Sequence, residues 1–520
     1  MLLLGEIVRR HARYRGKRLA YVLDHADGRT ERVTYAELDA GANRLAHVLA
    51  ARGVRRGDRV AILAQNCVEY PCTYFACCKL GAIVVPVNTR NKRDEIRHAI
   101  EFAEARIALV GPDFADEVGT LRRQGSLPLL DDVLLIDDAT AGASSTLERL
   151  APLLANASAE EPQPADPPDE HDAHVMLFTS GTTGVPKGAL LSQRTYFLQA
   201  GLTQTMNGLT DQDVGLSMFP MFHMGGWATP LGYWAIGGSL VIMRKADPRA
   251  MLAAVARERV SYLYAVPTLY NAMLALPDFD GFDLSSLRLL GGGTAYMPRE
   301  QIERITRAFG VDAMVVMYGQ TEAGPVTALR PRDLLRKAGS VGTPVNNVDV
   351  RIVDAEGRDA PPGVAGEIVV KSDFNMLGYW RMPEATAAAF AGGWLHTGDQ
   401  GLWDEDGFLW VVGRLKEMIK TGGENVFPAE VEAVLLRHEG IAECAVVGVP
   451  DPDWGESVLA VVVARRGASL SEEEVISFVR ERLAGFKKPR WVRFVAELPR
   501  TASTRQVQKA LLVDRFVQGW

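Results

Sequence analysis

Phe178-Thr179-Ser180-Gly181-Thr182-Thr183-Gly184-Val185-Pro186-Lys187-Gly188 is the stretch that decides the fold. An apolar run over residues 174–178 precedes it and predicts a buried strand, and Ser192 beyond it can cap a helix. We therefore expect a loop between a strand and a helix. Its glycines let backbone amides approach an anion closely, and its hydroxyl groups and lysine add donors. The loop is typical of phosphate binding; a connector without a ligand is the alternative.

The loop does not follow the Walker pattern GxxxxGK[ST]. Pro186 occupies the place of the second glycine of that pattern, and Gly188 the place of its Ser/Thr. The sequence therefore predicts a nucleotide cradle of a different kind.

Composition excludes several classes of protein. The chain has 520 residues, of which 47% are hydrophobic and 23% charged, with a formal net charge of -7. These values are typical of a globular protein of about two to four domains and argue against nucleic-acid binding. The first residues do not resemble a signal peptide, and no uncharged run reaches the roughly 18 residues of a membrane span. We expect a cytoplasmic protein without a transmembrane segment.

Cysteine use agrees with this location. Four of the five cysteines crowd into one apolar segment without a CxxC pair; the five are Cys67, Cys72, Cys77, Cys78 and Cys444. We expect buried free thiols, with metal or redox chemistry as the alternative.

Strands alternate with helices from residue 18 to residue 111, which predicts a parallel sheet covered by helices. Later strands are expected at 214–219, 239–243, 262–266, 287–290 and 313–317. The last three of these run into Pro- or Gly-rich loops. Because ligands bind beyond the carboxyl ends of strands in open α/β sheets, we expect these loops and the phosphate loop to meet at one cleft.

The sequence predicts mostly short strands after residue 339. Short strands at 348–354, 366–371 and 409–412 predict a small antiparallel barrel or sheet. Beyond residue 414 a compact mixed pattern of about a hundred residues predicts a separate α+β domain.

Three charged residues beyond the phosphate loop suit a nucleotide. Glu322 follows a predicted strand and is a hard oxygen ligand for Mg²⁺. Asp399, after Thr397-Gly398, can accept two hydrogen bonds from a ribose diol, and Arg414 can reach the same sugar or a phosphate. Taken singly, each is as consistent with a turn or a helix cap.

The segment 413–432, Gly-Arg-Leu-Lys-Glu-Met-Ile-Lys-Thr-Gly-Gly-Glu-Asn-Val-Phe-Pro-Ala-Glu-Val-Glu, completes a set of motifs in one order. With it, almost the whole chain resembles the adenylate-forming (AMP-binding) family of acyl-CoA synthetases. The resemblance implies an AMP-forming acid–thiol ligase that uses ATP, Mg²⁺ and CoA. It also implies a fold of two helix-covered, mostly parallel sheets plus a small β-barrel, followed by a small mobile α+β domain. The implied domains are 1–413 and 420–520, with a hinge at 414–419.

The resemblance also implies the role of individual residues. Lys187 lies near the β and γ phosphates, Thr321 contacts the α-phosphate, and Glu322 binds the metal. The other expected ATP-binding residues are Thr179, Ser180, Gly181, Thr182, Thr183, Gly184, Tyr318, Gly319, Gln320, Asp399 and Arg414. Lys416 is the hinge. The expected acyl-pocket residues are His223, Trp227, Gly292 and Gly293, and the expected CoA-tunnel residues are Gly422 and Gly423.

One position departs from the family. Members commonly carry Pro-Arg-Thr-Ala-Ser-Gly-Lys, whose lysine bonds the substrate carboxylate during adenylation. This chain reads Pro-Arg-Thr-Ala-Ser-Thr-Arg-Gln-Val-Gln-Lys over residues 499–509. Counting forward from Pro499 puts Arg505 in place of the lysine, and counting back from Lys509 puts Gln506 there. We assign the catalytic role to Arg505, whose planar guanidinium keeps the charge but not the shape of the ammonium.

The sequence leaves the substrate open. The predicted pocket glycines suggest room for a long or flat group, and no charged partner for a second carboxylate or an ammonium is evident. We expect a fatty or other aliphatic monocarboxylic acid, with an aryl acid as the alternative. Loading of a separate carrier protein and ligand binding without turnover are further alternatives, and a homodimer stays open.

Overall fold

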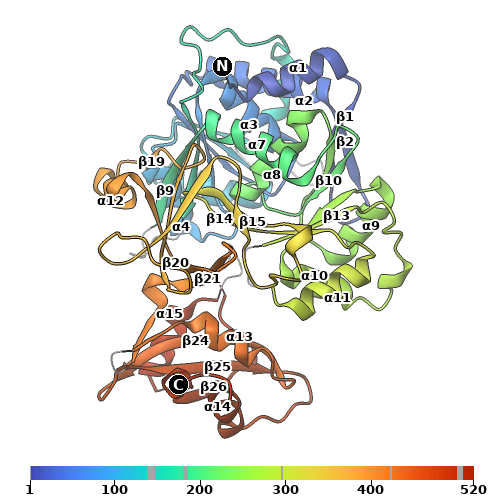
Figure 1. Cartoon of the computed structure of the whole chain (residues 1–520). Coiled ribbons are helices and arrows are strands. Elements are labelled where there is room, and N and C mark those ends of the chain that lie inside the picture. The colour runs from blue at the N-terminus through green and yellow to red at the C-terminus, as the bar shows by residue number, and fades with distance from the viewer. Residues whose placement is uncertain are drawn as a thin grey trace. The chain divides into compact units, whose positions relative to one another are not determined.

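The computed structural model describes residues 2–136, 147–179, 186–293, 297–421, 424–500 and 507–519 (Figure 1). The chain divides into two compact units. The first is Met1–Val350 with Val370–Leu395, and the second is Arg351–Val369 with His396–Trp520. The hinge expected at 414–419 concerns a motion between domains, and it stays a prediction.

A nine-stranded sheet in the first unit has the order β16-β15-β14-β13-β12-β10-β11-β1-β2. The pairings from β1 through β11, β10, β12 and β13 to β14 are parallel, whereas β2, β15 and β16 pair antiparallel at the two edges. Its strands are β1 (Leu19–Asp24), β2 (Thr30–Thr34), β10 (Val214–Ser217), β11 (Ser239–Met243), β12 (Tyr262–Tyr264), β13 (Leu289–Gly293), β14 (Met314–Gln320), β15 (Gly324–Leu329) and β16 (Thr343–Pro344).

An eight-stranded sheet in the same unit has the order β19-β9-β8-β4-β3-β5-β6-β7. It is parallel from β8 to β7, and β9 and β19 are added antiparallel at one edge. Its strands are β3 (Arg59–Leu63), β4 (Ile83–Pro86), β5 (Ile107–Val110), β6 (Asp132–Leu135), β7 (Glu148–Arg149), β8 (Ala173–Thr179), β9 (Lys187–Ser192) and β19 (Gly378–Tyr379). The prediction of two mostly parallel sheets is confirmed.

Helices cover these sheets and follow the expected signals. Thr34 and Glu37 form a capping box at the start of α2, and the Ser192 side chain caps α7 by accepting from the Thr195 amide. The helices are α1 (Gly5–Arg15), α2 (Tyr35–Ala51), α3 (Glu69–Leu80), α4 (Arg93–Phe102), α5 (Ala115–Arg123), α6 (Leu150–Asn156), α7 (Gln193–Asn207), α8 (Met224–Ile236), α9 (Pro248–Glu258), α10 (Pro267–Leu274), α11 (Arg299–Phe309) and α12 (Pro383–Ala389). Figure 1 shows α3, α7 and α8 close together, and α7 packs on α8.

Two sequence predictions are corrected. The phosphate loop does not lead directly into a helix: β9 lies between the loop and α7, because Ala189, Leu190 and Leu191 pair antiparallel with β8. The strands expected to form a small barrel instead make an open four-stranded sheet in the order β17-β18-β20-β21 within the described residues. These strands are β17 (Val348–Val353), β18 (Gly366–Ser372), β20 (Leu395–Trp403) and β21 (Leu409–Arg414). Among the described residues, β21 has no pairing with β17 that would close the sheet into a barrel.

The C-terminal part of the second unit is the expected α+β domain. Its sheet has the order β23-β22-β25-β24, with β26 paired to β25. Alternate residues of β24 and β25 face opposite sides: one side packs on α13 and α14, and the other packs on α15. The elements are β22 (Ile419–Thr421), β23 (Glu424–Val426), α13 (Pro428–Leu435), β24 (Ile441–Asp451), β25 (Gly455–Ala464), α14 (Glu472–Arg480), β26 (Trp491–Phe494) and α15 (Lys509–Val517).

The core of the first unit contains a buried histidine among aromatic rings. His174 of β8 is 1% exposed and lies against Tyr74, Tyr196 and Trp227. Its Nδ1 is 3.3 Å from the Sγ atom of Cys78. Burial lowers the pKa of His174 from 6.5 to about 3 and raises that of the Cys78 thiol, so both groups are neutral at pH 7. All five cysteines are free, and the four of residues 67–78 are buried, as expected.

Replacing this histidine should change how stability depends on pH. Because the folded-state pKa is depressed, the unfolded chain binds a proton between about pH 6.5 and pH 3 that the folded chain does not, so stability falls as the pH falls through this window. His174→Gln should lower stability at pH 7 but remove this slope, which is about 1.4 kcal/mol per pH unit. Urea unfolding of both proteins at pH 7 and pH 5.5 tests this; an equal difference at both pH values would contradict it.

No helix in the described part of the chain combines the length and the apolar character needed to cross a membrane.

Candidate active site

The ends of the phosphate loop lie side by side. Thr179 ends β8, Lys187 begins β9, and the two residues are register partners in the antiparallel pair. The predicted ligands between them, Ser180, Gly181, Thr182, Thr183 and Gly184, lie outside the described residues. A hairpin places both ends of the loop at one point of the sheet edge, so Thr179 and Lys187 can face the same ligand.

Glu322 meets this hairpin from the other sheet. It lies in the turn between β14 and β15, and its Oε1 accepts a hydrogen bond of 2.9 Å from the Thr179 hydroxyl. Thr321 lies in the same turn, and Tyr318, Gly319 and Gln320 end β14. A Cβ atom on Gly319 would lie 2.4 Å from the carbonyl oxygen of Gly324, so only glycine fits the backbone there. The structure therefore joins the two predicted nucleotide motifs of the first unit.

Tyr379 is a residue of this site that the sequence analysis missed. Its hydroxyl donates a 3.1 Å hydrogen bond to Oε1 of Glu322, and the ammonium nitrogen of Lys187 lies 4.8 Å from the centre of its ring. Burial and the Glu322 carboxylate raise the pKa of Tyr379, which keeps the hydroxyl protonated. No sequence signal marks this residue, because the strand that carries it is two residues long and pairs with β9, far away in the chain.

The donor set around Glu322 suits a hard cation that arrives with a nucleotide. A carboxylate and a hydroxyl are the oxygen ligands that Mg²⁺ prefers. Among the described residues no group of three or more His, Cys, Asp or Glu side chains gathers to hold a metal. Phosphate oxygens and water are the ligands that commonly complete the coordination of Mg²⁺ beside one or two carboxylates.

The residues expected in the acyl pocket come from two parts of the first unit, the start of α8 and the end of β13. His223 is the N-cap residue of α8, and its ring centre lies 4.5 Å from that of Phe222. Trp227 is fully buried and stacks on Tyr74 at 4.1 Å between ring centres. Its indole thus belongs to the aromatic core, and its role in the acyl pocket stays a prediction.

The predicted pocket glycines lie at the end of β13, with their side-chain space taken by protein. A Cβ atom on Gly292 would meet the sulfur of Met297 at 2.7 Å, and one on Gly293 would meet the hydroxyl of Tyr264 at 2.5 Å. These glycines permit close packing of neighbouring side chains, and their role in the acyl pocket stays a prediction.

In the second unit, Asp399 and Arg414 lie side by side, and their role as ribose ligands stays a prediction. They are register partners in β20 and β21, and the Arg414 Nε atom lies 3.1 Å from Oδ1 of Asp399. Asp399 is 5% exposed. Lys416 lies in the short 3-10 helix η5 (Leu415–Glu417) that follows β21. The other predicted residues of this unit, Gly422, Gly423, Arg505 and Gln506, lie outside the described residues.

The residues on either side of segment 501–506 pair with each other. Arg500 and Val507 form a β-bridge, and the Gln508 amide donates to the Pro499 carbonyl oxygen at 2.8 Å. Lys509 follows, and its ammonium lies 3.1 Å from a Glu417 oxygen and 2.9 Å from a Glu432 oxygen. Lys509 is thus engaged by two carboxylates of its own unit.

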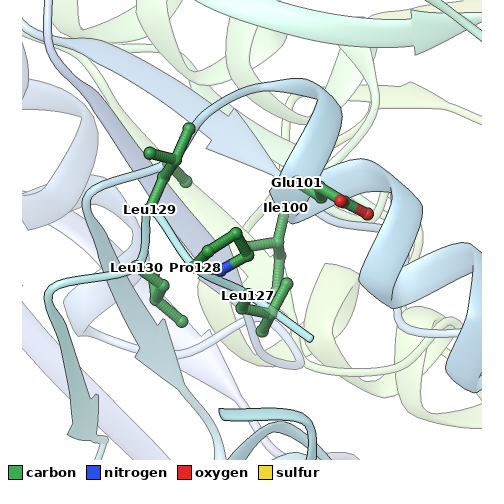
Figure 2. Close-up of a pocket in the computed structure, with 7 residues that line it drawn as sticks. Ile100, Glu101, Leu127, Pro128, Leu129 and Leu130 are labelled. Carbon is green, nitrogen blue, oxygen red and sulfur yellow. The ribbon is translucent and has the colours of Figure 1, made fainter. Parts of the chain in front are cut away.

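A shallow depression lies elsewhere in the first unit (Figure 2). It is lined mainly by apolar side chains from α4, from the turn between α4 and β5, and from the segment before β6: Ile100, Glu101, Ala105, Leu127, Pro128, Leu129 and Leu130. None of the predicted site residues lines it, so it is separate from the candidate active site.

The chain matches two family models. Residues 8–380 match the AMP-binding enzyme family, and residues 430–505 match the AMP-binding enzyme C-terminal domain. The chain belongs to the AMP-binding enzyme family.

Similar proteins cover 91% or more of this chain. Feruloyl-CoA synthase of an Amycolatopsis species is 39% identical over 478 residues, 91% of each chain. The long-chain-fatty-acid–CoA ligase FadD13 of Mycobacterium tuberculosis is 36% identical over 515 residues, 99% of this chain and 98% of its own. The crystal structure of the anthranilate CoA ligase AuaEII in complex with anthranoyl-AMP superposes with a TM-score of 0.88 at 30% identity, covering 99% of this chain and 97% of that chain.

The two ion pairs of Lys509 should stabilise the start of α15. Lys509→Met leaves two carboxylates facing each other, and because the lysine side chain is 22% exposed we expect a local loss of about 1–2 kcal/mol. Hydrogen–deuterium exchange of the full chain should show about tenfold faster exchange in α15. Arg500→Met, which removes a more exposed ion pair with Glu443, is the matched control and should change exchange less than about threefold. Equal effects of the two variants would contradict the stabilising role.

Proposed function

We propose that this member of the AMP-binding enzyme family is an ATP-dependent acid–CoA ligase. The single observation that supports this most is the Glu322 carboxylate, bonded to the Thr179 hydroxyl beside the end of the phosphate loop. Two of the similar proteins are named as CoA ligases for different acids, which supports the same reaction.

The reaction has two steps. A carboxylate oxygen of the acid attacks the α-phosphorus of ATP, the bond to the bridging oxygen breaks, and pyrophosphate leaves with the electron pair. The CoA sulfur, losing its proton, then attacks the acyl carbonyl carbon, and the bond to AMP breaks. Charge builds on phosphoryl oxygens in the first step, so catalysis depends on positioning and electrostatic stabilisation.

Four residues of this chain have separate roles in binding ATP and the acid. Lys187 holds the phosphates that become pyrophosphate, and Asp399 accepts hydrogen bonds from the ribose diol. Glu322 would hold Mg²⁺, which supplies charge neutralisation at the phosphate oxygens. Arg505 would bond the substrate carboxylate in place of the usual lysine.

The C-terminal domain moves between the two steps. The segment 420–520 turns about Lys416 between the two steps, so that one domain presents two faces in succession. We propose a cytoplasmic enzyme, and a homodimer stays open.

The acid is a monocarboxylic acid with an uncharged tail. An aliphatic acid is the first candidate, and an aryl acid is the alternative. Transfer to a carrier protein is the second candidate acceptor, because CoA and carrier proteins share the pantetheine arm.

The two steps should respond differently to changes in segment 501–506. We expect adenylation to be slow in the native chain, and Arg505→Ala to lower it a further ~100- to 1,000-fold, the effect typical of losing one preorganised donor. Transfer from synthetic acyl-AMP to CoA should change less than about threefold. Pyrophosphate exchange and thioester formation measured separately test this. Gln506→Ala is the matched control, and a larger loss from that variant would move the role to Gln506.

The choice of acid should be visible in a substrate panel. CoA-dependent AMP release measured over fatty acids of increasing chain length, benzoates and cinnamates should give the highest kcat/KM for an aliphatic acid. An aryl acid that exceeds every aliphatic acid would reverse the assignment while leaving the reaction type intact.

A further inference from the structure

Tyr379 contacts both charged residues that the first unit contributes to the nucleotide site. Its hydroxyl donates to Glu322 Oε1 at 3.1 Å, and its ring lies 4.8 Å from the Lys187 ammonium. All three residues belong to the first compact unit. A single side chain therefore connects the expected metal ligand with the expected phosphate ligand.

The two hydrogen bonds to Glu322 fall on the same oxygen. Thr179 donates to Oε1 at 2.9 Å and Tyr379 donates to Oε1 at 3.1 Å. Within the described part of the chain, Oε2 accepts no hydrogen bond. Two donors on one oxygen fix the orientation of the carboxylate and leave the other oxygen for a cation.

The ring of Tyr379 makes the second contact. A lysine ammonium within about 6 Å of an aromatic ring centre is attracted by the negative face of the ring. Among the described residues no carboxylate pairs with Lys187 within salt-bridge distance. The ring therefore holds Lys187 near the loop while leaving its charge available to an incoming polyphosphate.

Backbone hydrogen bonds hold Tyr379 in place. The amide of Leu377 donates to Leu190 at 2.7 Å and the amide of Trp380 donates to Gly188 at 2.8 Å, so both sides of the tyrosine are fixed to β9. The amide of Met376 donates to the Glu322 carbonyl oxygen at 2.8 Å, and the Tyr379 amide donates to the Thr386 hydroxyl at 2.9 Å. The segment is bound to Glu322 and to β9 at once, so the side chain of Tyr379 is preorganised.

We propose that Tyr379 is a positioning residue for adenylation: its hydroxyl orients Glu322 toward Mg²⁺, and its ring holds Lys187 for the β and γ phosphates. The inference rests on the proposed function and adds a residue to its machinery. Tyr379 touches Glu322 and Lys187 and acts through them.

Two substitutions distinguish the role of the Tyr379 hydroxyl from that of its ring. Tyr379→Phe keeps the ring and removes the bond to Glu322, so the Mg²⁺ concentration that half-saturates ATP binding should rise about 3- to 10-fold, while ATP affinity at saturating Mg²⁺ stays within about twofold. Tyr379→Leu removes both contacts, so ATP affinity should also fall about 5-fold or more at saturating Mg²⁺. Calorimetric titration of the full chain with ATP over a series of Mg²⁺ concentrations measures both quantities without turnover.

Pyrophosphate exchange provides the second readout. For Tyr379→Phe, excess Mg²⁺ should restore the exchange rate, and thioester formation from synthetic acyl-AMP should be unchanged. Tyr14→Phe, at a tyrosine that is 75% exposed on α1, is the matched control and should match the native chain in every measurement.

The outcomes are distinguishable. An unchanged Mg²⁺ dependence in Tyr379→Phe, or a loss of ATP affinity that excess Mg²⁺ does not restore, would overturn the inference. Thermal unfolding of each variant identifies a loss caused by misfolding, and in that case the conservative Tyr379→Phe titration decides. If the native chain itself binds no ATP in the presence of Mg²⁺, the proposed function fails and the inference fails with it.

Discussion

The candidate site of the first unit depends on the pairing of a very short strand with β9. Backbone bonds from Leu377 and Trp380 to β9 attach the chain near residue 379 to the strand that carries Lys187. A further bond from Met376 attaches the same segment to the turn that carries Glu322. Because these bonds join β9 to the turn after β14, they also join the eight- and nine-stranded sheets. Motifs far apart in the chain reach one place through this connection.

The sequence was informative where local physics decides the structure. Apolar alternation placed most strands within one to three residues, as at β11 (Ser239–Met243), and capping signals placed the starts of α2 and α7. The order of the charged motifs identified the family, which the family models then showed. Each of these features depends on neighbours in sequence, so a single chain is enough to recognise it.

The sequence was uninformative where distant contacts decide. Tyr379 carries no sequence signal because both of its partners are distant in the chain. Lys187 lies almost two hundred residues before it, and Glu322 is nearer but still outside any local motif. The extra strand β9 was missed because a short apolar run after a glycine-rich loop fits a strand or the first turn of a helix. In both cases contacts between residues far apart in the chain decided the structure.

The edge position of β9 also has a consequence for synthesis of the chain. As the polypeptide emerges from the ribosome, β8 and β9 are complete long before β19 exists, since Gly378–Tyr379 lies far toward the C-terminus. Until then β9 is an edge strand whose outer hydrogen-bonding groups are unpaired, which is the feature that promotes association between chains. The nascent protein thus carries an open, aggregation-prone edge beside its nucleotide loop, and the short strand that completes the site also closes that edge.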